Sequence, residues 1–486
     1  MAGVPVKLGS VLSFIIVIYS VYYRYYTLVD SRLSPVRDHL LVLERDNVVG
    51  VGEYQPRVSL GYGACHDLFV NATALLSYEE LPKGDPEHYN EISTKEEFLK
   101  SFAYYFKHGA AAERFMSNSK LYDELVEKAL KLPGSRWSIG GNAPLMAKRF
   151  FIEGWKVLFA AKMSDKLKSY IPQEIEIVGN NDFEEVKDDV HMILEYRADE
   201  EWGPLKAPRA NRYIMHNDEN NPLLSSLEKF GEALPDFGPH LLVISGLQMM
   251  DNYPFKKGNL KGIREKRLNL VKQQILSQPS NTLVHFEMAS YVELELLLQL
   301  TDKVIPYVDS IGMNEQELSN LQNILEYGKV SFVADSNPRV ATALDQMRKI
   351  FQFIRQKGKD KLTRIHVHTL AYQAILTVKK SEWKRTEAAA AKAALTAHRY
   401  VCNAQKVSLQ KSKLILDDSF STTAENGNSR VFFKPDKPVS CWGEVLEGVE
   451  VDICVAPVLI CTEAQLTAGA GDNISAAGLV LQVESK

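Results

Sequence analysis

The sequence lacks an excess of charge of either sign. Its 486 residues include 57 lysines and arginines and 61 aspartates and glutamates, which gives a formal net charge of −4. Proteins that bind nucleic acid need a basic surface, so we expect no nucleic-acid partner. Hydrophobic residues make up 45% and charged residues 24% of the chain. These fractions are ordinary for a globular protein, and the length allows one large domain with a smaller one.

Cysteine is scarce, and none of the five cysteines belongs to a C-x-x-C pair. This argues against a zinc ribbon and against a thioredoxin-type site. Cys402, Cys441, Cys454 and Cys461 lie toward the C-terminus. In an oxidising compartment two of them would form one disulfide, and the sequence does not indicate which two. The alternative is that all four are free thiols in the core.

Long apolar runs are missing except near the N-terminus. Leu8 to Tyr23 carry no charge and are flanked by Lys7 and Arg24. A full membrane span needs about twenty apolar residues, and this run is shorter. A basic start followed by an apolar core is typical of a secretory signal or a signal anchor, and the bulky tyrosines that follow offer no small-residue cleavage site.

We therefore predict that residues 1–26 form a signal anchor or signal peptide and that residues 27–56 form a helical linker. The body of the protein is expected to be membrane-anchored in the lumen of the endoplasmic reticulum, or secreted. Membrane contact is expected through the N-terminal segment only. The alternative is a buried N-terminal helix, which fits less well with a run that is apolar on all sides.

Internal repeats and low-complexity tracts are also missing, and apolar strands alternate instead with segments of helical spacing. The pattern predicts strands at 58–63, 136–139, 155–161, 175–178, 190–196, 240–246, 282–287, 304–311, 364–369 and 451–460. It predicts helices at 95–105, 109–132, 142–153, 262–278, 292–300, 314–328, 384–403 and 476–482. Repeated strand–helix units of this kind predict an α/β fold, in which helices cover both faces of a mostly parallel sheet.

The stretch LTAGAGDNIS, residues 466–475, separates the last predicted strand from the last predicted helix. Its glycines let the backbone approach a ligand closely. The free N–H groups of the new helix favour an anion such as phosphate. Asp472, in or beside the first turn, is placed to take a proton from a hydroxyl that attacks a phosphoryl group. The simpler interpretation of Asp472 is a carboxylate that favours the helix dipole.

Other polar residues also follow predicted strands. Ligand sites in open α/β sheets lie at the carboxyl ends of the strands, so these residues are candidates for one site. They are Asp67, Gly140 to Asn142, Gln248, His285 to Glu287, Asn314 to Glu317, His366 to His368 and Gly469 to Asp472.

With these elements in this order, the chain resembles the ADP-dependent glucokinases, which are ribokinase-like sugar kinases. The resemblance extends from about Arg57 to the C-terminus, and an N-terminal hydrophobic segment suits the animal members. Its motifs are G-A-A-A-E-R-F (109–115), G-G-N-A (140–143), A-P-R-A-N-R-Y (207–213), S-G-L-Q-M-M (245–250), H-F-E (285–287), G-M-N-E-Q-E-L (312–318), R-I-H-V-H-T-L (364–370) and T-A-G-A-G-D (467–472).

The resemblance implies a fold and a reaction. The fold would be a ribokinase-like α/β kinase domain at 57–486, with a smaller α+β lid from about 68–140 and 196–221. The reaction would convert ADP and glucose into AMP and glucose 6-phosphate, with one Mg²⁺ per site, in a monomer.

The resemblance also implies roles for individual residues. Asp472 would be the base, Gly469, Ala470 and Gly471 the backbone anion hole, and Arg212 a stabiliser of phosphoryl charge. Glu287 and Glu317, together with Asp472, would hold Mg²⁺ largely through water. The sugar site would consist of Asp67, Glu113, Gly140, Gly141 and Asn142.

Simpler structural interpretations stay open for several of these residues. Asn314 and Glu317 would form only a helix-capping box. His285 and Glu287 would be a satisfied polar pair on one strand face. The remaining candidates have similar alternatives: Asp67 as a turn cap, Glu113 as a solvated helix position, Gly140 and Gly141 as a turn, and His366 and His368 as core or nucleotide-pocket residues.

The chain departs from the family pattern at Gly63, where relatives usually carry an asparagine, and also at His66 and Leu466. Loss of one amide contact to a sugar hydroxyl costs about 1 kcal/mol. Two alternatives to an ADP-dependent glucokinase therefore stay open. One is a ribokinase-like kinase of another sugar or donor, and the other is a non-catalytic sugar- or nucleotide-binding relative.

Overall fold

The computed structural model describes residues 4–48, 55–181, 185–256, 260–331, 335, 337–356, 360–425, 429–466 and 468–484, without the side chains of 4–14 and 23–30. Residues 1–3 of the predicted anchor, residues 49–54 of the predicted linker and Thr467 of the T-A-G-A-G-D motif therefore lie outside the described residues.

A ten-stranded sheet forms the centre of the larger lobe, in the order β20-β21-β16-β15-β14-β13-β12-β1-β6-β7. The strands from β7 to β15 pair in parallel, and β16, β21 and β20 add an antiparallel edge. Their bounds are β1 Arg57–Gly61, β6 Lys156–Ala160, β7 Glu176–Val178, β12 Leu241–Ile244, β13 Leu283–Glu287, β14 Ser310–Asn314, β15 Arg364–His368, β16 Tyr372–Val378, β20 Ser440–Leu446 and β21 Val449–Pro457. The predicted mostly parallel sheet is confirmed.

Helices cover both faces of this sheet. In β12, Leu242 and Ile244 belong to the apolar core that also contains residues of α7 to α11, whereas Leu241 and Val243 belong to the core that contains residues of α5 and α13. Successive strand residues point to opposite faces, so the continuous apolar strand encodes a sheet that is buried on both sides. The helices are α5 Asn142–Ile152, α6 Asp165–Lys168, α7 Leu227–Phe237, α8 Ile263–Leu276, α9 Leu294–Lys303, α10 Glu315–Tyr327, α11 Val340–Gln356, α12 Thr386–Val401 and α13 Ala470–Val480.

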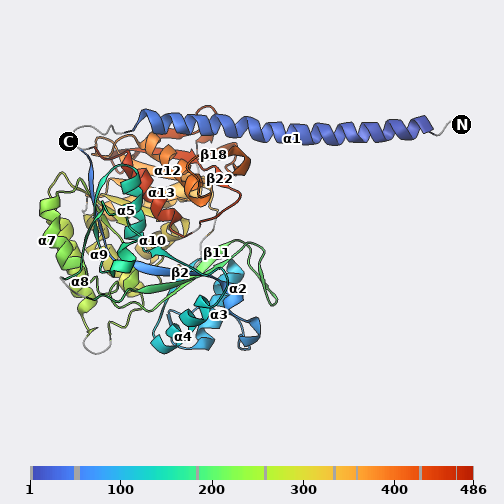
Figure 1. The fold of residues 1–486 in the computed structure, drawn as a ribbon. Helices are drawn as coiled ribbons and strands as arrows, with labels where there is room; N and C mark the ends of the chain where they lie inside the picture. The colour runs from blue at the N-terminus through green and yellow to red at the C-terminus, as the bar shows by residue number, and fades with distance from the viewer. Residues whose placement is uncertain are drawn as a thin grey trace.

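A second, six-stranded sheet forms the smaller lobe, below the main body in Figure 1. Its order is β3-β4-β11-β8-β2-β5, and helices α2, α3 and α4 pack against one face through a separate apolar core. The elements are β2 Cys65–Asn71, α2 Ala72–Leu75, β3 Glu91–Ile92, α3 Lys95–His108, β4 Ala112–Met116, α4 Ser119–Leu130, β5 Arg136–Gly140, β8 Val190–Tyr196 and β11 Asn211–His216. The lobe thus includes β8 besides the segments expected for a lid, and its action as a lid stays a prediction.

Short strand pairs complete the fold: β9 Glu201–Trp202 with β10 Leu205–Lys206, β17 Ser412–Lys413 with β22 Ile460–Cys461, and β18 Ser419–Ser421 with β19 Arg430–Phe432. One disulfide was expected from the sequence, whereas the structure has two. Cys402 bonds to Cys461 and Cys441 bonds to Cys454, which leaves Cys65 as a buried free thiol.

The predicted helix at 109–132 was wrong, because the segment contains a strand and a shorter helix. Gly109 ends α3 in the left-handed conformation, with φ of 58°. Strand β4 follows, and Asn118 then caps α4 with its side chain. The alanines and glutamate of 110–113 are good helix formers, but tertiary pairing with β11 overrides that local preference. Glu113 is therefore a strand residue and not a solvated helix position.

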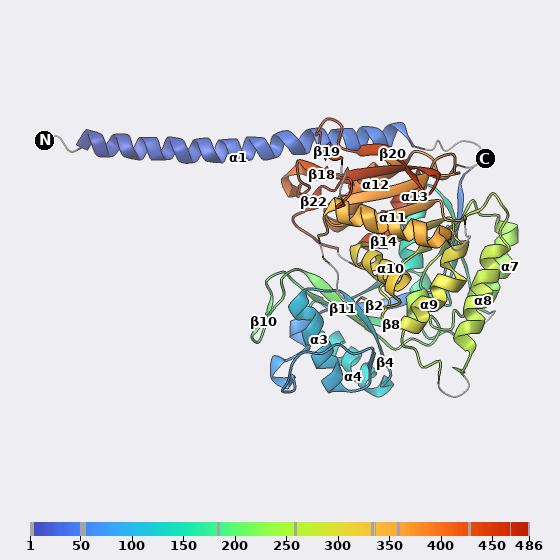
Figure 2. The same ribbon diagram turned by 180° about the vertical axis from the view of Figure 1, so that it is seen from behind.

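Helix α1, Val4–Asp46, is continuous and projects far from the body in Figures 1 and 2. Its C-terminal part packs on the body through Leu33, Val36 and Leu40, all at most 2% exposed. Ile15 to Ile18 are instead 54–58% exposed. Within the described residues, no helix has the combination of length and apolar character that a membrane crossing requires.

Candidate active site

Two neighbouring cavities lie where the carboxyl ends of the main strands face the second sheet. The first cavity has a volume of about 170 Å³ and the second about 510 Å³. Predicted residues line both cavities, which places residues from distant parts of the chain at one location. The side chains and backbone that the two cavities share are Asn142, Arg212, Asn314, Glu317, Gly469 and Asp472.

The turn before α13 forms part of the shared wall. Gly469 is the helix N-cap with φ of 73°, and a Cβ there would lie 2.4 Å from Cδ1 of Leu145. A Cβ on Gly471 would lie 2.9 Å from Cε1 of His368. Both positions need glycine for space, and Gly469 needs it for conformation as well. The close packing brings the free N–H groups of the α13 N-terminus to the cavity wall.

Asp472 lies in the first turn of α13 and is 8% exposed. Asn142 Nδ2 donates a hydrogen bond to Asp472 Oδ1 over 2.7 Å. Gln248 Nε2 in turn donates to Asn142 Oδ1 over 2.5 Å. Burial raises the pKa of Asp472, although the hydrogen bond from Asn142 and the charge of Arg212 act in the opposite direction. The chain Gln248–Asn142–Asp472 fixes the orientation of the carboxylate.

Two further carboxylates, Glu317 and Glu287, line the second cavity. The expected capping box is present, since Asn314 N donates to Glu317 Oε2 over 2.9 Å and Asn314 Oδ1 accepts from Glu317 N. The expected polar pair is present too, with 2.9 Å between His285 Nε2 and Glu287 Oε2. These structural roles coexist with a position at the cavity.

Burial governs the charge of both glutamates. It raises the pKa of Glu317 to about 8, and the nearby Asp472 carboxylate adds to the increase. It raises the pKa of Glu287 well above the usual range, again with a contribution from Asp472. Three carboxylates that disfavour one another's ionisation form an oxygen donor set, which fits a hard divalent cation.

One face of the second sheet supplies the opposite wall of the first cavity. Asp67 on β2 pairs in register with His191 on β8, and Ile214 on β11 pairs with Glu113 on β4. Arg212, two residues before Ile214, shares its face. Asp67, Glu113, His191 and Arg212 all line the first cavity. Asp67 is thus a strand residue rather than a turn cap, and burial raises its pKa to about 6.

His191 and Asp218 are functional candidates that sequence analysis missed. His191 Nε2 lies 2.9 Å from both oxygens of Asp218, whose side chain is fully buried. Burial opposes protonation, but the charge of Asp218 dominates and raises the pKa of His191 to about 10. The alternation within 190–196 indicates the face on which His191 lies. The pairing of β8 with β2 links residues far apart in the sequence, and no local signal reports it.

The two glycines of the G-G-N-A motif have different places. Gly141, the N-cap of α5 with φ of 98°, lines the first cavity. Gly140 does not, since it lies behind Asp67, where a Cβ would be 1.9 Å from Asp67 Oδ1. Gly63 has φ of 77°, and a Cβ there would lie 2.4 Å from Asn221 Oδ1. The Asn221 amide, which also lines the first cavity, therefore occupies the space beside Gly63.

The second cavity combines cationic and apolar walls. Arg212 Nε is buried and has no hydrogen-bond partner among the described residues. Arg209, also missed from the sequence, lines the same cavity, as does the predicted His368. His366 instead bonds to Gln373 in the core. The apolar wall consists of Leu370, Ala397, Val401, Val458 and Ile460. Of these, only Leu370 belongs to a motif that the sequence revealed.

Comparisons with known proteins agree with this architecture. The model of the ADP-specific phosphofructokinase/glucokinase conserved region matches residues 56–481. An ADP-dependent glucokinase of Bos taurus is 34% identical over 432 residues, which cover 87% of this chain and 84% of the relative. A probable ADP-dependent glucokinase of Caenorhabditis elegans is 27% identical over 486 residues, with 97% and 93% covered.

A solved structure supports the fold. An ADP-dependent kinase in complex with fructose-6-phosphate and ADPβS superposes with a TM-score of 0.65 at 17% identity, over 92% of this chain and 97% of that chain. The chain thus has a ribokinase-like fold, and the family match spans both lobes and both cavities. It belongs to the ADP-specific phosphofructokinase/glucokinase family and is a sugar kinase, which is a phosphotransferase.

Proposed function

We propose that the protein is an ADP-dependent glucokinase, which transfers the terminal phosphoryl group of ADP to glucose and releases AMP and glucose 6-phosphate. The proposal rests on one observation, which is that the two cavities share Asp472 and Gly469 in their walls. The first cavity would hold the sugar, and the second would hold the nucleotide against its apolar wall. An in-line transfer needs this arrangement, because acceptor and donor must approach one reacting phosphorus from opposite sides.

The first cavity offers hydrogen-bonding groups suited to a sugar. Asp67 and Glu113 provide carboxylate oxygens, Asn142 provides an amide, and His191 adds an imidazole beside Asp67. Carboxylates and amides accept hydrogen bonds from sugar hydroxyls, and their fixed positions on strands select the hydroxyl geometry. Gly140 would act indirectly, by leaving room for Asp67.

Asp472 would take the proton from the attacking sugar hydroxyl. Asn142 holds one of its oxygens and would keep the carboxylate oriented during the transfer. The backbone of Gly469, Ala470 and Gly471 would bind the transferred phosphoryl group at the α13 N-terminus. The unpartnered Nε of Arg212 would donate to the same oxygens and stabilise the charge that spreads over them.

Glu287 and Glu317, with Asp472, would hold a Mg²⁺ ion largely through water. The buried carboxylates fit such an ion, since their mutual repulsion is relieved by a cation. A bound Mg²⁺ would neutralise phosphate charge. We further infer that the smaller lobe acts as a lid, which would exclude water as a competing acceptor once both substrates are bound.

We also infer that α1 contacts the endoplasmic reticulum membrane, with the body in the lumen. The exposed Ile15 to Ile18 supply an apolar surface, and two disulfides suit an oxidising compartment. Release of the protein from membranes by high-pH carbonate would contradict the anchor. A monomer suffices for the chemistry, because one chain lines both cavities.

The test of the function is a coupled glucose 6-phosphate assay on the full chain with Mg²⁺ and either ADP or ATP. We expect turnover with ADP, equimolar AMP release, and little turnover with ATP. Turnover with ATP alone would overturn the donor assignment. Turnover with another hexose but not with glucose would overturn the acceptor assignment.

A further inference from the structure

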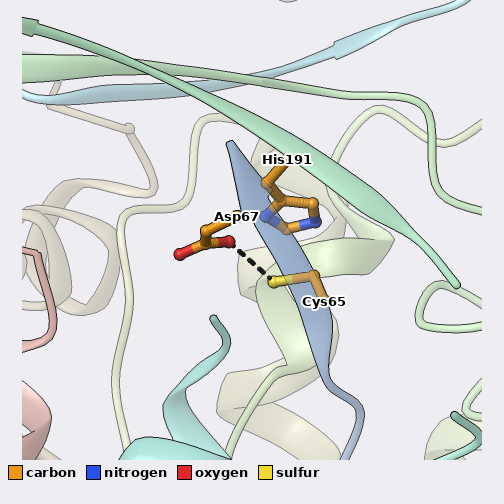
Figure 3. A group of neighbouring side chains, drawn as sticks. All are labelled: Cys65, Asp67 and His191. Carbon is orange, nitrogen blue, oxygen red and sulfur yellow. Dashed lines mark hydrogen bonds between the residues drawn. The ribbon is translucent and has the colours of Figure 1, made fainter. Parts of the chain in front are cut away.

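Asp67 and His191, which line the first cavity, lie beside the thiol of Cys65, which does not line it and has no role in the proposed phosphoryl transfer. Cys65, Asp67 and His191 each offer one ligand atom, and these atoms lie within 4.8 Å of one another. Figure 3 shows the thiol of Cys65 directed at the Asp67 carboxylate, with the His191 ring beside both. The three side chains are only 1%, 7% and 4% exposed, so they converge in the interior rather than on a solvated face.

Strand geometry creates this convergence. Cys65 and Asp67 are two residues apart on β2 and share a face, and His191 pairs with Asp67 on the neighbouring β8. Cys65 Sγ lies 3.2 Å from Asp67 Oδ1. The Oε1 atom of Glu113 lies 3.7 Å from His191 Nδ1 and offers a fourth donor. Ligand atoms around a tetrahedral zinc ion are roughly 3.3 to 3.8 Å apart, given the usual zinc–ligand bond lengths.

The surroundings of His191 supply an independent observation. Its Nε2 is held by both oxygens of Asp218, which leaves Nδ1 on the side of Glu113. Histidines that bind metals usually donate their other ring N–H to a carboxylate, which fixes the ring and its tautomer. The Asp218–His191 pair has this arrangement.

We propose that Cys65, Asp67 and His191 form a site for a thiophilic divalent cation, of which Zn²⁺ is the natural example, and that this cation excludes the sugar. The exclusion rests on the proposed function, because Asp67 and His191 line the cavity assigned to the sugar. Glu113 or a water molecule completes the coordination. Mg²⁺ does not compete, because a thiolate ligand selects a softer ion.

Binding of the metal ion would leave the net charge of the site unchanged. A Sγ–zinc bond forms as the thiol proton leaves to solvent, and a nitrogen–zinc bond forms as the proton on His191 Nδ1 leaves. A doubly charged ion thus replaces two protons among the carboxylates of Asp67, Glu113 and Asp218. The cavity provides the route of entry, since Asp67, Glu113 and His191 all line it.

Cobalt(II) is the probe for the site, because a cobalt–thiolate bond gives a near-ultraviolet charge-transfer band. All five cysteines lie in the described part of the chain, and Cys65 alone is not in a disulfide. We expect the full-length, metal-free protein to develop the band with one equivalent of Co²⁺ and to lose it when Zn²⁺ is added. The Cys65→Ala variant should not develop the band, although it should melt cooperatively and phosphorylate glucose.

His66→Gln is the matched control. His66 follows Cys65 on β2, points to the other face and stacks on Trp137, with ring centroids 4.0 Å apart. This variant should keep the band. A band that persists in Cys65→Ala would overturn the site, because the thiolate would then come from another cysteine. Cobalt bound without any band would also overturn it and would favour the neighbouring group of His191, His216 and Asp218.

Kinetics test the exclusion of sugar. Zn²⁺ should raise the apparent KM for glucose without changing kcat at saturating glucose, and Cys65→Ala should need at least ten times more Zn²⁺ for the same effect. A cobalt–thiolate band that persists at saturating glucose would overturn the exclusion. Failure of the zinc-free protein to phosphorylate glucose with ADP and Mg²⁺ would refute the proposed function instead, while the cobalt band would still report the metal site.

Discussion

At the residue scale, the position of the Asp67 side chain depends on the lack of a Cβ atom at Gly140. Gly140 leaves no space between its Cα and the Asp67 carboxylate, since a Cβ would lie 1.9 Å from Oδ1. Backbone hydrogen bonds hold both strands, so the carboxylate would have to move. The sequence motif identified Gly140 as a sugar-site residue. In the structure Gly140 does not line the first cavity but leaves room for the Asp67 side chain, and a motif does not distinguish these two positions.

We predict that Gly140→Ala raises the KM for glucose by at least about tenfold, because Asp67 is pushed out of its position. The KM for ADP should stay near its original value. Steady-state kinetics with each substrate varied would measure both. Gly134→Ala is the control, because nothing lies within 4 Å of a Cβ there. Its φ of 82° is unfavourable for alanine, so this variant should lose some stability but keep both KM values. An equal rise in both KM values would contradict the specific role.

Arg212 is the residue whose unpartnered Nε most directly suggests an anion. We predict that Arg212→Ala lowers kcat by about 100-fold, since one donor to the developing charge is lost. Arg212→Lys should recover part of this loss, because a point charge replaces the guanidinium fork. Arg45→Ala, at a side chain that is 74% exposed, is the control. An unchanged kcat for Arg212→Ala would remove the residue from the transfer step.

At the element scale, a partly buried ion-pair cluster joins α1 to α12. Glu44 accepts hydrogen bonds from Arg399 Nη1 and Nη2, both over 2.8 Å, and from Lys392 Nζ over 3.0 Å. Burial acts to raise the pKa of Glu44, but the two cations outweigh it, and the pKa lies below its ordinary value of 4.5. Folding therefore favours the ionised form.

We predict that Glu44→Gln lowers the free energy of unfolding by about 2 kcal/mol at neutral pH. A lowered pKa in the folded state stabilises the protein above pH 4.5, and this contribution is lost as the pH falls through the lowered value. The difference between parent and variant should shrink over that acid range in urea denaturation. Asp46→Asn, in a pair that is 74% and 55% exposed, should cost little. A difference that persists in acid would contradict the ionic origin.

The helices and strands differ in how well the sequence alone predicted them. The strand at 241–244 was predictable, since its apolar run ends before Gly246 and both faces are buried. The segment 109–132 was not, because helix-forming residues occupy a strand that pairing with β11 stabilises. Motif residues at strand ends were found, whereas His191 and Asp218 depend on the neighbours of β8. Strand order is set by packing of the whole chain, and local patterns do not encode it.

At the scale of the whole molecule, the two sheets meet around the two cavities. The larger lobe supplies Glu287 from β13, Glu317 from α10 and Asp472 from α13, and the second sheet supplies Asp67 and Arg212. Neither lobe holds a complete site by itself. This division is what the proposed lid movement requires, with an open state for exchange of substrates and product and a closed state for chemistry.

The central claim is that phosphoryl transfer occurs where the cavities meet, with Asp472 as the base. Asp472→Asn keeps the shape and the partner Asn142 but removes the base. Measured against Asp165→Asn, whose side chain is 98% exposed, the variant should lose about 1000-fold in kcat for glucose phosphorylation with ADP. Its KM values for both substrates should stay close to those of the parent. Undiminished turnover by Asp472→Asn would contradict the account.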